Sequence, residues 1–161
     1  MARSARFLPV RYCAFLFLIV PVLLGGCASI NIPHYVGDEH PYEKTFYNDY
    51  EAVLKVTKDV LDETGWKIFN ITNPSVYEQS KVVVPQGKQI LILTEVRLTP
   101  MFLGTRYSRL NIYLRAGTEV NTTYAEIRYV SVNSFFYMTF KNYNKNTGVK
   151  NLFNRIEKKL E

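Results

Sequence analysis

Alternating apolar and polar residues dominate the second half of this chain. The alternation runs through three segments, 89–98, 106–116 and 122–132, which are separated by short connections. Because successive side chains of a β-strand point to opposite faces of a sheet, each segment is predicted to be a strand with one covered face. Short connections leave no room for a crossover, so neighbouring strands are predicted to be antiparallel.

The two faces of this predicted sheet differ in chemistry. One face is apolar and is formed by Ile90, Ile92, Val96, Leu98, Leu110, Ile112, Leu114, Ala125 and Ile127. The other face is polar and is formed by Glu95, Arg97, Arg109, Asn111, Tyr113, Arg115, Glu126 and Arg128. One covered face and one hydrated face are typical of an antiparallel sheet with helices on one side.

Two amphipathic segments flank the strands and are predicted to be the covering helices. Apolar residues recur at helical spacing over 50–61, and Gly65 is a natural C-terminal stop. Asn48, with a glutamate three residues later, resembles a capping box, and Thr45 is an alternative start. The second helix is expected at 147–160, where apolar residues again form a stripe.

Further strands are expected at 66–71 and 76–84, whereas 134–146 is compatible with either a sixth strand or a loop. Together these elements predict an α+β fold in a single domain at 44–161. We expect an antiparallel sheet of about five strands, with an N-terminal and a C-terminal helix packed on one face.

The first 26 residues have the organisation of a secretion signal. Three arginines and no acid precede residue 12, and the segment 12–24 is almost entirely apolar. A helix of this length spans about 20 Å, which is short of the roughly 30 Å hydrocarbon core of a bilayer. The segment 1–26 is therefore predicted to be a signal peptide rather than a membrane-spanning helix.

The end of this segment, Leu24-Gly25-Gly26-Cys27, resembles the bacterial lipobox. The resemblance implies that the Cys27 thiol receives a diacylglycerol, that cleavage occurs just before it, and that the new amine is acylated. Residues 27–43 would then be a lipidated Cys followed by a tether. The next residue is Ala28 and not Asp, which favours the outer membrane, facing the periplasm. The alternatives are an ordinary secretory signal with a coincidental Cys, and an uncleaved anchor.

A second resemblance concerns the domain. The spacing Tyr50…Val53-Leu54…Val60-Leu61…Gly65-Trp66, the antiparallel strands and the closing helix resemble the helix-grip domains of small bacterial lipoproteins. These domains include that of BamC, an accessory lipoprotein of the outer-membrane barrel-assembly machinery. The resemblance covers 44–161 and implies a BamC-like architecture with a non-enzymatic accessory role in the envelope.

The sequence offers little catalytic chemistry. Its two histidines, His34 and His40, both lie in the predicted tether, where a pre-organised catalytic or metal site is not expected. Glu95 and Glu126 lie among arginines on the predicted polar face, which favours cross-strand ion pairs over a pair of catalytic acids. We therefore predict no enzymatic activity, no metal and no cofactor apart from the covalent lipid on Cys27.

Charge and exposed aromatic residues suggest contact surfaces. Residues 27–80 carry 4 basic and 9 acidic side chains, and residues 81–161 carry 13 and 5. In the envelope the expected acidic partners are lipid phosphates, anionic glycans and protein carboxylates rather than nucleic acid. One candidate surface lies on the polar face and comprises Arg109, Tyr113, Arg115 and Arg128. The other is the apolar loop segment Met101, Phe102 and Leu103, which should either be buried or contact a partner or membrane.

These observations favour a lipid-anchored binding or accessory module of the outer membrane, active in envelope assembly or maintenance. Its partner is expected to be an envelope protein or a cell-wall polymer. The alternative is a carrier of a lipid or small ligand, which would use a groove between the helices and the sheet.

Overall fold

The computed structural model describes residues 30–37, 41–78, 87–135, 138–143 and 146–161. Its elements in chain order are β1 (Tyr42–Phe46), α2 (Tyr50–Glu63), β2 (Ile68–Thr72), the 3-10 helix η1 (Pro74–Val76), β3 (Gln89–Thr94), β4 (Arg97–Met101), β5 (Gly104–Ala116), β6 (Thr123–Phe135), β7 (Met138–Asn142) and α3 (Asn146–Leu160). The α+β class and the antiparallel sheet are confirmed. The sheet has seven strands in the described residues rather than about five.

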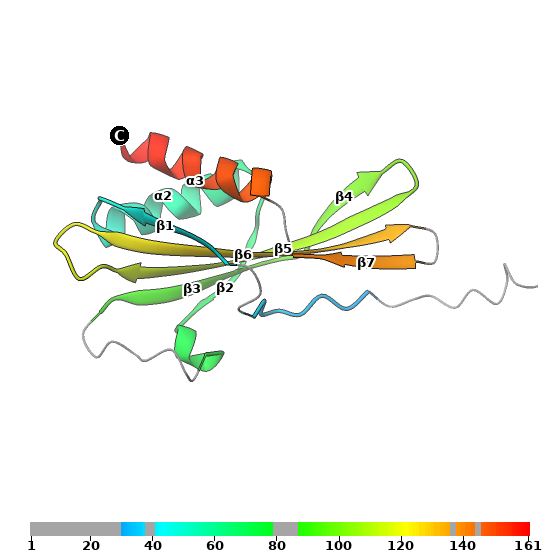
Figure 1. The fold of residues 1–161 in the computed structure, drawn as a ribbon, viewed down its shortest axis with the longest axis horizontal. Helices are drawn as coiled ribbons and strands as arrows, with labels where there is room; N and C mark the ends of the chain where they lie inside the picture. Colours follow the sequence, from blue (N-terminus) through cyan, green and yellow to red (C-terminus); the bar gives the residue numbers. More distant parts are fainter. Residues whose placement is uncertain (1–29, 38–40, 79–86, 136–137, 144–145) are drawn as a thin grey trace, which may run out of the picture. The chain divides into compact units, whose positions relative to one another are not determined.

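The sheet is organised around β5 and β6 (Figure 1). Each of these strands has 13 residues, and the two pair along their whole length, from Gly104 with Phe135 to Ala116 with Thr123. The main strand order is β1-β6-β5-β3-β2, while β4 pairs with β5 and β7 pairs with β6 outside this path. The β5–β6 pair therefore carries two different sets of neighbours along its length.

One set of neighbours forms a separate part of the sheet, which we call the wing. It consists of β4, residues 104–108 of β5, residues 131–135 of β6, and β7. Beyond the wing, residues 111–115 of β5 pair with β3, and residues 123–127 of β6 pair with β1. In Figure 1 the wing extends beyond the two helices, which lie over the other part of the sheet.

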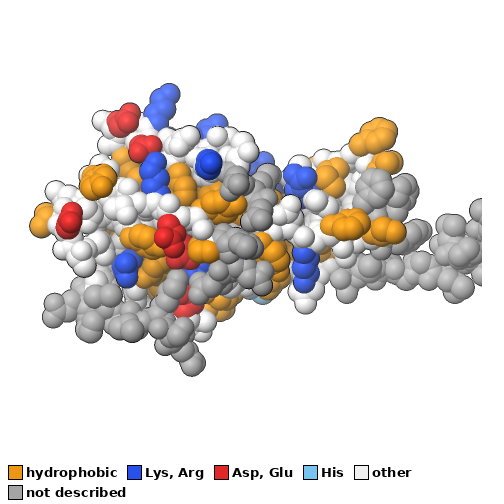
Figure 2. All heavy atoms as spheres, in the orientation of Figure 1, with side chains coloured by type: hydrophobic (Ala, Val, Ile, Leu, Met, Phe, Trp, Pro, Cys, Tyr) orange, Lys and Arg blue, Asp and Glu red, His pale blue; other side chains and the backbone are white. Residues whose placement is uncertain are grey.

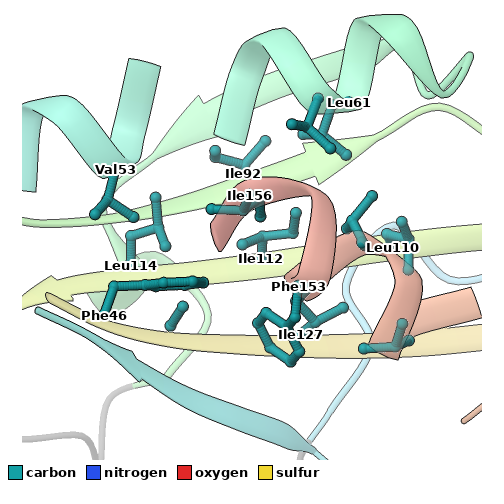
Figure 3. Close-up of a cluster of buried hydrophobic side chains, with 14 of the residues drawn as sticks. Phe46, Val53, Leu61, Ile92, Leu110, Ile112, Leu114, Ile127, Phe153 and Ile156 are labelled. Atoms are coloured by element: carbon teal, nitrogen blue, oxygen red, sulfur yellow. The ribbon is translucent and has the colours of Figure 1, made fainter. Parts of the chain in front are cut away.

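The hydrophobic core lies between the helices and the main part of the sheet (Figure 3). Its fully buried side chains include Val53 and Leu61 from α2, Ile156 from α3, and Ile112 and Ile127 from the sheet. Burial of one such side chain stabilises the fold by about 1.5–3 kcal/mol. Both helices thus cover the same face, as the apolar alternation predicts for the middle of β5 and β6.

The core ends before the wing begins. Among the described residues, the cluster contains no part of β5 before Leu110 and no part of β6 after Tyr129. The apolar core beneath the helices therefore stops short of the wing.

The strand predicted at 89–98 is wrong as a single element. β3 ends at Thr94 and β4 begins at Arg97, and the pairing with β5 shifts by one residue between them, from Leu93 with Asn111 to Arg97 with Ser108. This break moves Leu98 out of the core, and its side chain is 61% exposed.

Other strand predictions also need correction. The segment 76–84 does not begin as a strand, since Val76 ends the 3-10 helix, and residues 79–84 lie outside the described residues. The alternative left open at 134–146 is settled by β7. β1 begins at Tyr42, inside the segment 27–43 that was expected to be a tether.

The start of α2 differs from the prediction by one residue. Its N-cap is Asp49, whose Oδ2 accepts a hydrogen bond from the Glu51 N–H at 2.9 Å, so a capping box led by Asn48 is wrong. The predicted stop is confirmed: Gly65 has a φ of 74°, and the Trp66 N–H donates to the Leu61 carbonyl at 2.8 Å. Glycine adopts this left-handed conformation without steric cost.

We expect Asp49→Ala to lower the free energy of unfolding by about 1 kcal/mol, because it removes the acceptor for an N–H at the start of α2. Asn48→Ala is the matched control, and its effect should stay within about 0.5 kcal/mol. Urea unfolding of the two variants measures both values. A larger loss for Asn48→Ala than for Asp49→Ala would contradict the assignment of the cap.

Candidate interaction surface

The polar face of β5 and β6 is covered by the segment 31–37, which we call the strap (Figure 1). Arg109 points away from the helices and its Nη1 donates to the Pro33 carbonyl at 2.7 Å and to the Ile32 carbonyl at 3.3 Å. Burial lowers the pKa of the Arg109 guanidinium. Two backbone carbonyls of the strap therefore replace the water that this side chain would otherwise bind.

Asn111 binds the strap from the next position on the same face. Its Nδ2 donates to the His34 carbonyl at 3.3 Å, and its Oδ1 accepts from the Val36 N–H. Asn111 is fully buried and Val36 is 1% exposed. Both ends of the amide are thus satisfied by the strap, which fixes the position of the strap on the sheet.

A buried charge cluster completes this face. The Arg128 guanidinium forms ion pairs with Glu126 and with Glu78, and the Tyr35 hydroxyl donates to Glu78 and accepts from Arg128. The Tyr35 ring stacks on Tyr77 with 4.9 Å between ring centroids. The strap, β6 and the residues after η1 therefore meet at one guanidinium.

The protonation states in this cluster follow from their surroundings. Burial acts to lower the pKa of Arg128, but its hydrogen bonds with Glu78 and Glu126 outweigh burial and raise it. Burial, reinforced by the hydrogen bond to Glu78, raises the pKa of the Tyr35 hydroxyl. Arg128 is therefore cationic and Tyr35 neutral at neutral pH.

The expectation that this face is an exposed contact surface is wrong for Arg109, Tyr113 and Arg128, which are 5%, 5% and 1% exposed. Arg115 is half-buried, and its guanidinium carbon lies 5.3 Å from the centroid of the Tyr124 ring. The physical reason is the strap, whose residues belong to the domain although they were expected to form part of a free tether.

The second candidate surface is exposed. Phe102 and Leu103 form the turn between β4 and β5, and they are 98% and 44% exposed. Met101, the last residue of β4, is half-buried. Of the two outcomes expected for this segment, burial under the helices is excluded.

Four strand ends meet beside this turn. Gly104 pairs with Met101 on one side and with Phe135 on the other, and Phe135 pairs with Met138 at the start of β7. We call the exposed or half-buried apolar side chains at this end the wing tip: Met101, Phe102, Leu103 and Met138. The exposed Leu98 and Phe140 lie further back, opposite Tyr107 and Asn133. Figure 2 shows hydrophobic side chains gathered over this end of the wing.

The charge of the wing has one sign. The sequence contains no Asp or Glu between residues 96 and 118 or between residues 127 and 156, whereas Arg97, Arg106 and Lys141 lie on wing strands. Arg106 Nε donates to Asn133 Oδ1 at 2.8 Å, and Lys141 is exposed. The charged side chains that follow the apolar end along the strands are therefore all basic.

The space between the helices and the sheet, where a carrier would hold its ligand, is filled by the core cluster. A pocket of about 240 Å³ lies at its edge and is lined by residues that include Trp66, Arg97, Tyr129 and Arg155. Ligand pockets usually measure about 300–1,000 Å³. This pocket is smaller than that range.

Cys27 and His40 lie outside the residues that the structure describes. Within the described ranges, no three His, Cys, Asp or Glu side chains gather where they could hold a metal ion. None of the helices in these ranges has the length and apolar character that crossing a membrane requires. No protein-family model, curated protein sequence or solved structure matches the chain.

We expect Arg128→Ala to lower the free energy of unfolding by about 3–5 kcal/mol, because Glu78 and Glu126 would be left buried without their cation. Arg115→Ala on the same face is the control, and it should cost only about 0.5–1 kcal/mol, the value of a cation–π contact. Chemical unfolding measures both. Equal losses for the two variants would show that Arg128 does not hold the strap to the sheet.

Proposed function

We propose that this protein is a lipid-anchored binding module of the bacterial cell envelope. Lipid on Cys27 would hold it at the outer membrane, with the domain in the periplasm. There it would act without catalysis, as an accessory factor in envelope assembly or maintenance. The observation that carries the proposal is the wing tip, an exposed apolar end with basic side chains behind it.

Phe102 and Leu103 are not part of the described hydrophobic core. Tight two-residue turns between antiparallel strands favour Asn and Gly, which tolerate left-handed backbone conformations. Here the turn holds Phe102 and Leu103, and Phe102 is 98% exposed. Contiguous exposed apolar residues with a polar surround mark interaction sites in soluble domains. Binding gives these side chains a role that the fold does not.

The anchor and the domain support the same kind of activity. The lipobox resemblance at Cys27 supports attachment to a membrane, and two or three acyl chains bind a bilayer far more firmly than one. The helix-grip resemblance supports an accessory role. The wing tip, at one end of the sheet, would then let the membrane-anchored domain bind a component of the same envelope.

Substitution of the lipobox cysteine tests the anchor. Cys27→Ala should leave an uncleaved precursor and abolish incorporation of labelled fatty acid, because the lipid-accepting thiol is missing. Cys13→Ala, in the predicted signal peptide, is the control and should be processed and labelled like the wild type. Normal processing of Cys27→Ala would remove the lipoprotein assignment.

Photo-cross-linking in living cells tests the contact surface. A photoreactive amino acid at position 102 should form adducts with an envelope component, because Phe102 lies at the wing tip. The same amino acid at position 120 is the control, since Val120 is also 90% exposed but lies in the turn at the opposite end of β5 and β6. Equal yields of adducts at both positions would exclude the wing tip as the binding surface.

A further inference from the structure

We propose that the wing tip binds the phospholipid surface of the bilayer that carries the anchor. The domain would then contact its membrane at two points, through the lipid on Cys27 and through the end of the wing. This inference rests on the proposed function, since the anchor is what brings the wing to the bilayer.

The order of side chains along the wing matches the layers of a bilayer surface. Phe102 and Leu103 lie at the outermost turn, and Met138 starts the neighbouring strand. Arg106 and Lys141 follow three to four residues further along their strands, which corresponds to roughly 10–13 Å. Apolar side chains at a membrane surface reach about 5–10 Å into the boundary between headgroups and acyl chains. The cations would then lie at the level of the phosphates.

The wing lacks acidic residues, as expected of a surface that binds anionic phospholipid headgroups. A phospholipid surface with anionic headgroups attracts Lys and Arg and repels Asp and Glu. The wing contributes Arg106 and Lys141 near its tip, while Arg97 at its base donates to the Thr64 carbonyl at 2.9 Å. Its two sequence segments contain no acid. The opposite end of β5 and β6 differs, because Glu119 lies beside Val120 in its turn. Only the wing end combines apolar exposure with uniform positive charge among the described residues.

The length of the chain between anchor and domain also favours this contact. Cys27 precedes Ile32 by five residues, which span at most about 18 Å when fully extended. The Ile32 carbonyl is bound to Arg109, the first residue of β5 beyond the wing. The five residues from Arg109 to Gly104 at the tip cover roughly 17 Å. A lipid on Cys27 therefore keeps the base of the wing close enough for the tip to reach the same bilayer.

The size of the surface favours lipid over a protein partner. A stable protein interface buries about 800 Å² on each side and uses about 20–30 residues. The wing tip consists of four apolar side chains at the end of two hairpins. Insertion of a few apolar side chains into a headgroup region needs no larger surface.

Depth-dependent fluorescence tests the contact with the lipid-modified full chain reconstituted into vesicles of phosphatidylethanolamine and phosphatidylglycerol. Trp66 is the only tryptophan, so Trp66→Phe provides a dark background. Phe102→Trp in that background should emit at shorter wavelength and lose emission when the lipids carry brominated acyl chains. Val120→Trp is the matched control and should show neither change. Thermal unfolding of each variant verifies that the domain remains folded.

A charge variant tests the electrostatic part of the proposal. Lys141→Gln should reduce the quenching of Phe102→Trp in these vesicles more than in vesicles of phosphatidylcholine alone. Equal emission of Phe102→Trp with and without brominated lipid, in a chain whose Cys27 carries lipid, would overturn the membrane contact and leave the anchor intact. Protein adducts in place of lipid adducts at position 102 in cells would also overturn it, while supporting a binding function. A chain without lipid on Cys27 would overturn both proposals.

Discussion

The pairing of β5 with β6 is the constraint on which the other elements depend. Both helices pack on its middle, the strap crosses its opposite face, and the wing strands add to its end. A slip of one residue would exchange Ile112 with Asn111 between the two faces and would place polar groups in the core. Both faces of the middle of β5 and β6 are buried, and both oppose this slip. The face under the helices opposes it through apolar packing, and the face under the strap opposes it through hydrogen bonds.

The buried polar face determines which segment covers it. An ion such as Arg128 is costly to bury unless carboxylates and hydrogen bonds compensate it. Glu126 provides one carboxylate from the same strand, but Glu78 and the Tyr35 hydroxyl come from elsewhere in the chain. An apolar residue in place of Tyr35 would remove the hydroxyl that donates to Glu78 and accepts from Arg128. The polar face is therefore covered through the Tyr35 hydroxyl and backbone groups of the strap, whereas the opposite face is covered by apolar side chains of the helices.

Sequence patterns predicted the elements in which apolar side chains recur at the regular spacing of a helix or a strand. Helix α3, the middle of β5 and core residues such as Ile112 and Ile156 follow from spacing alone. The strap could not be predicted from the sequence, because Ile32 and Pro33 bind Arg109 through backbone carbonyls, which every residue possesses. Side-chain alternation likewise continues through Glu95, where the strand is interrupted, because a one-residue shift in the pairing with β5 leaves no mark in the sequence.

The exposure of the wing tip is a consequence of length. An α-helix rises about 1.5 Å per residue and a strand about 3.3 Å, so the 14 residues of α2 span roughly 21 Å, whereas the 13 residues of β5 span roughly 43 Å. Helices of this size along the sheet can cover only about half of such a strand. Phe102 was recognisable from sequence as an unusual turn residue, but its exposure depends on the extension of β5 to Gly104 and of β6 to Phe135. Because the strands are longer than the helices, the wing tip is exposed and also lies beyond the helices. A flat surface such as a bilayer can therefore contact the wing tip without contacting the helices.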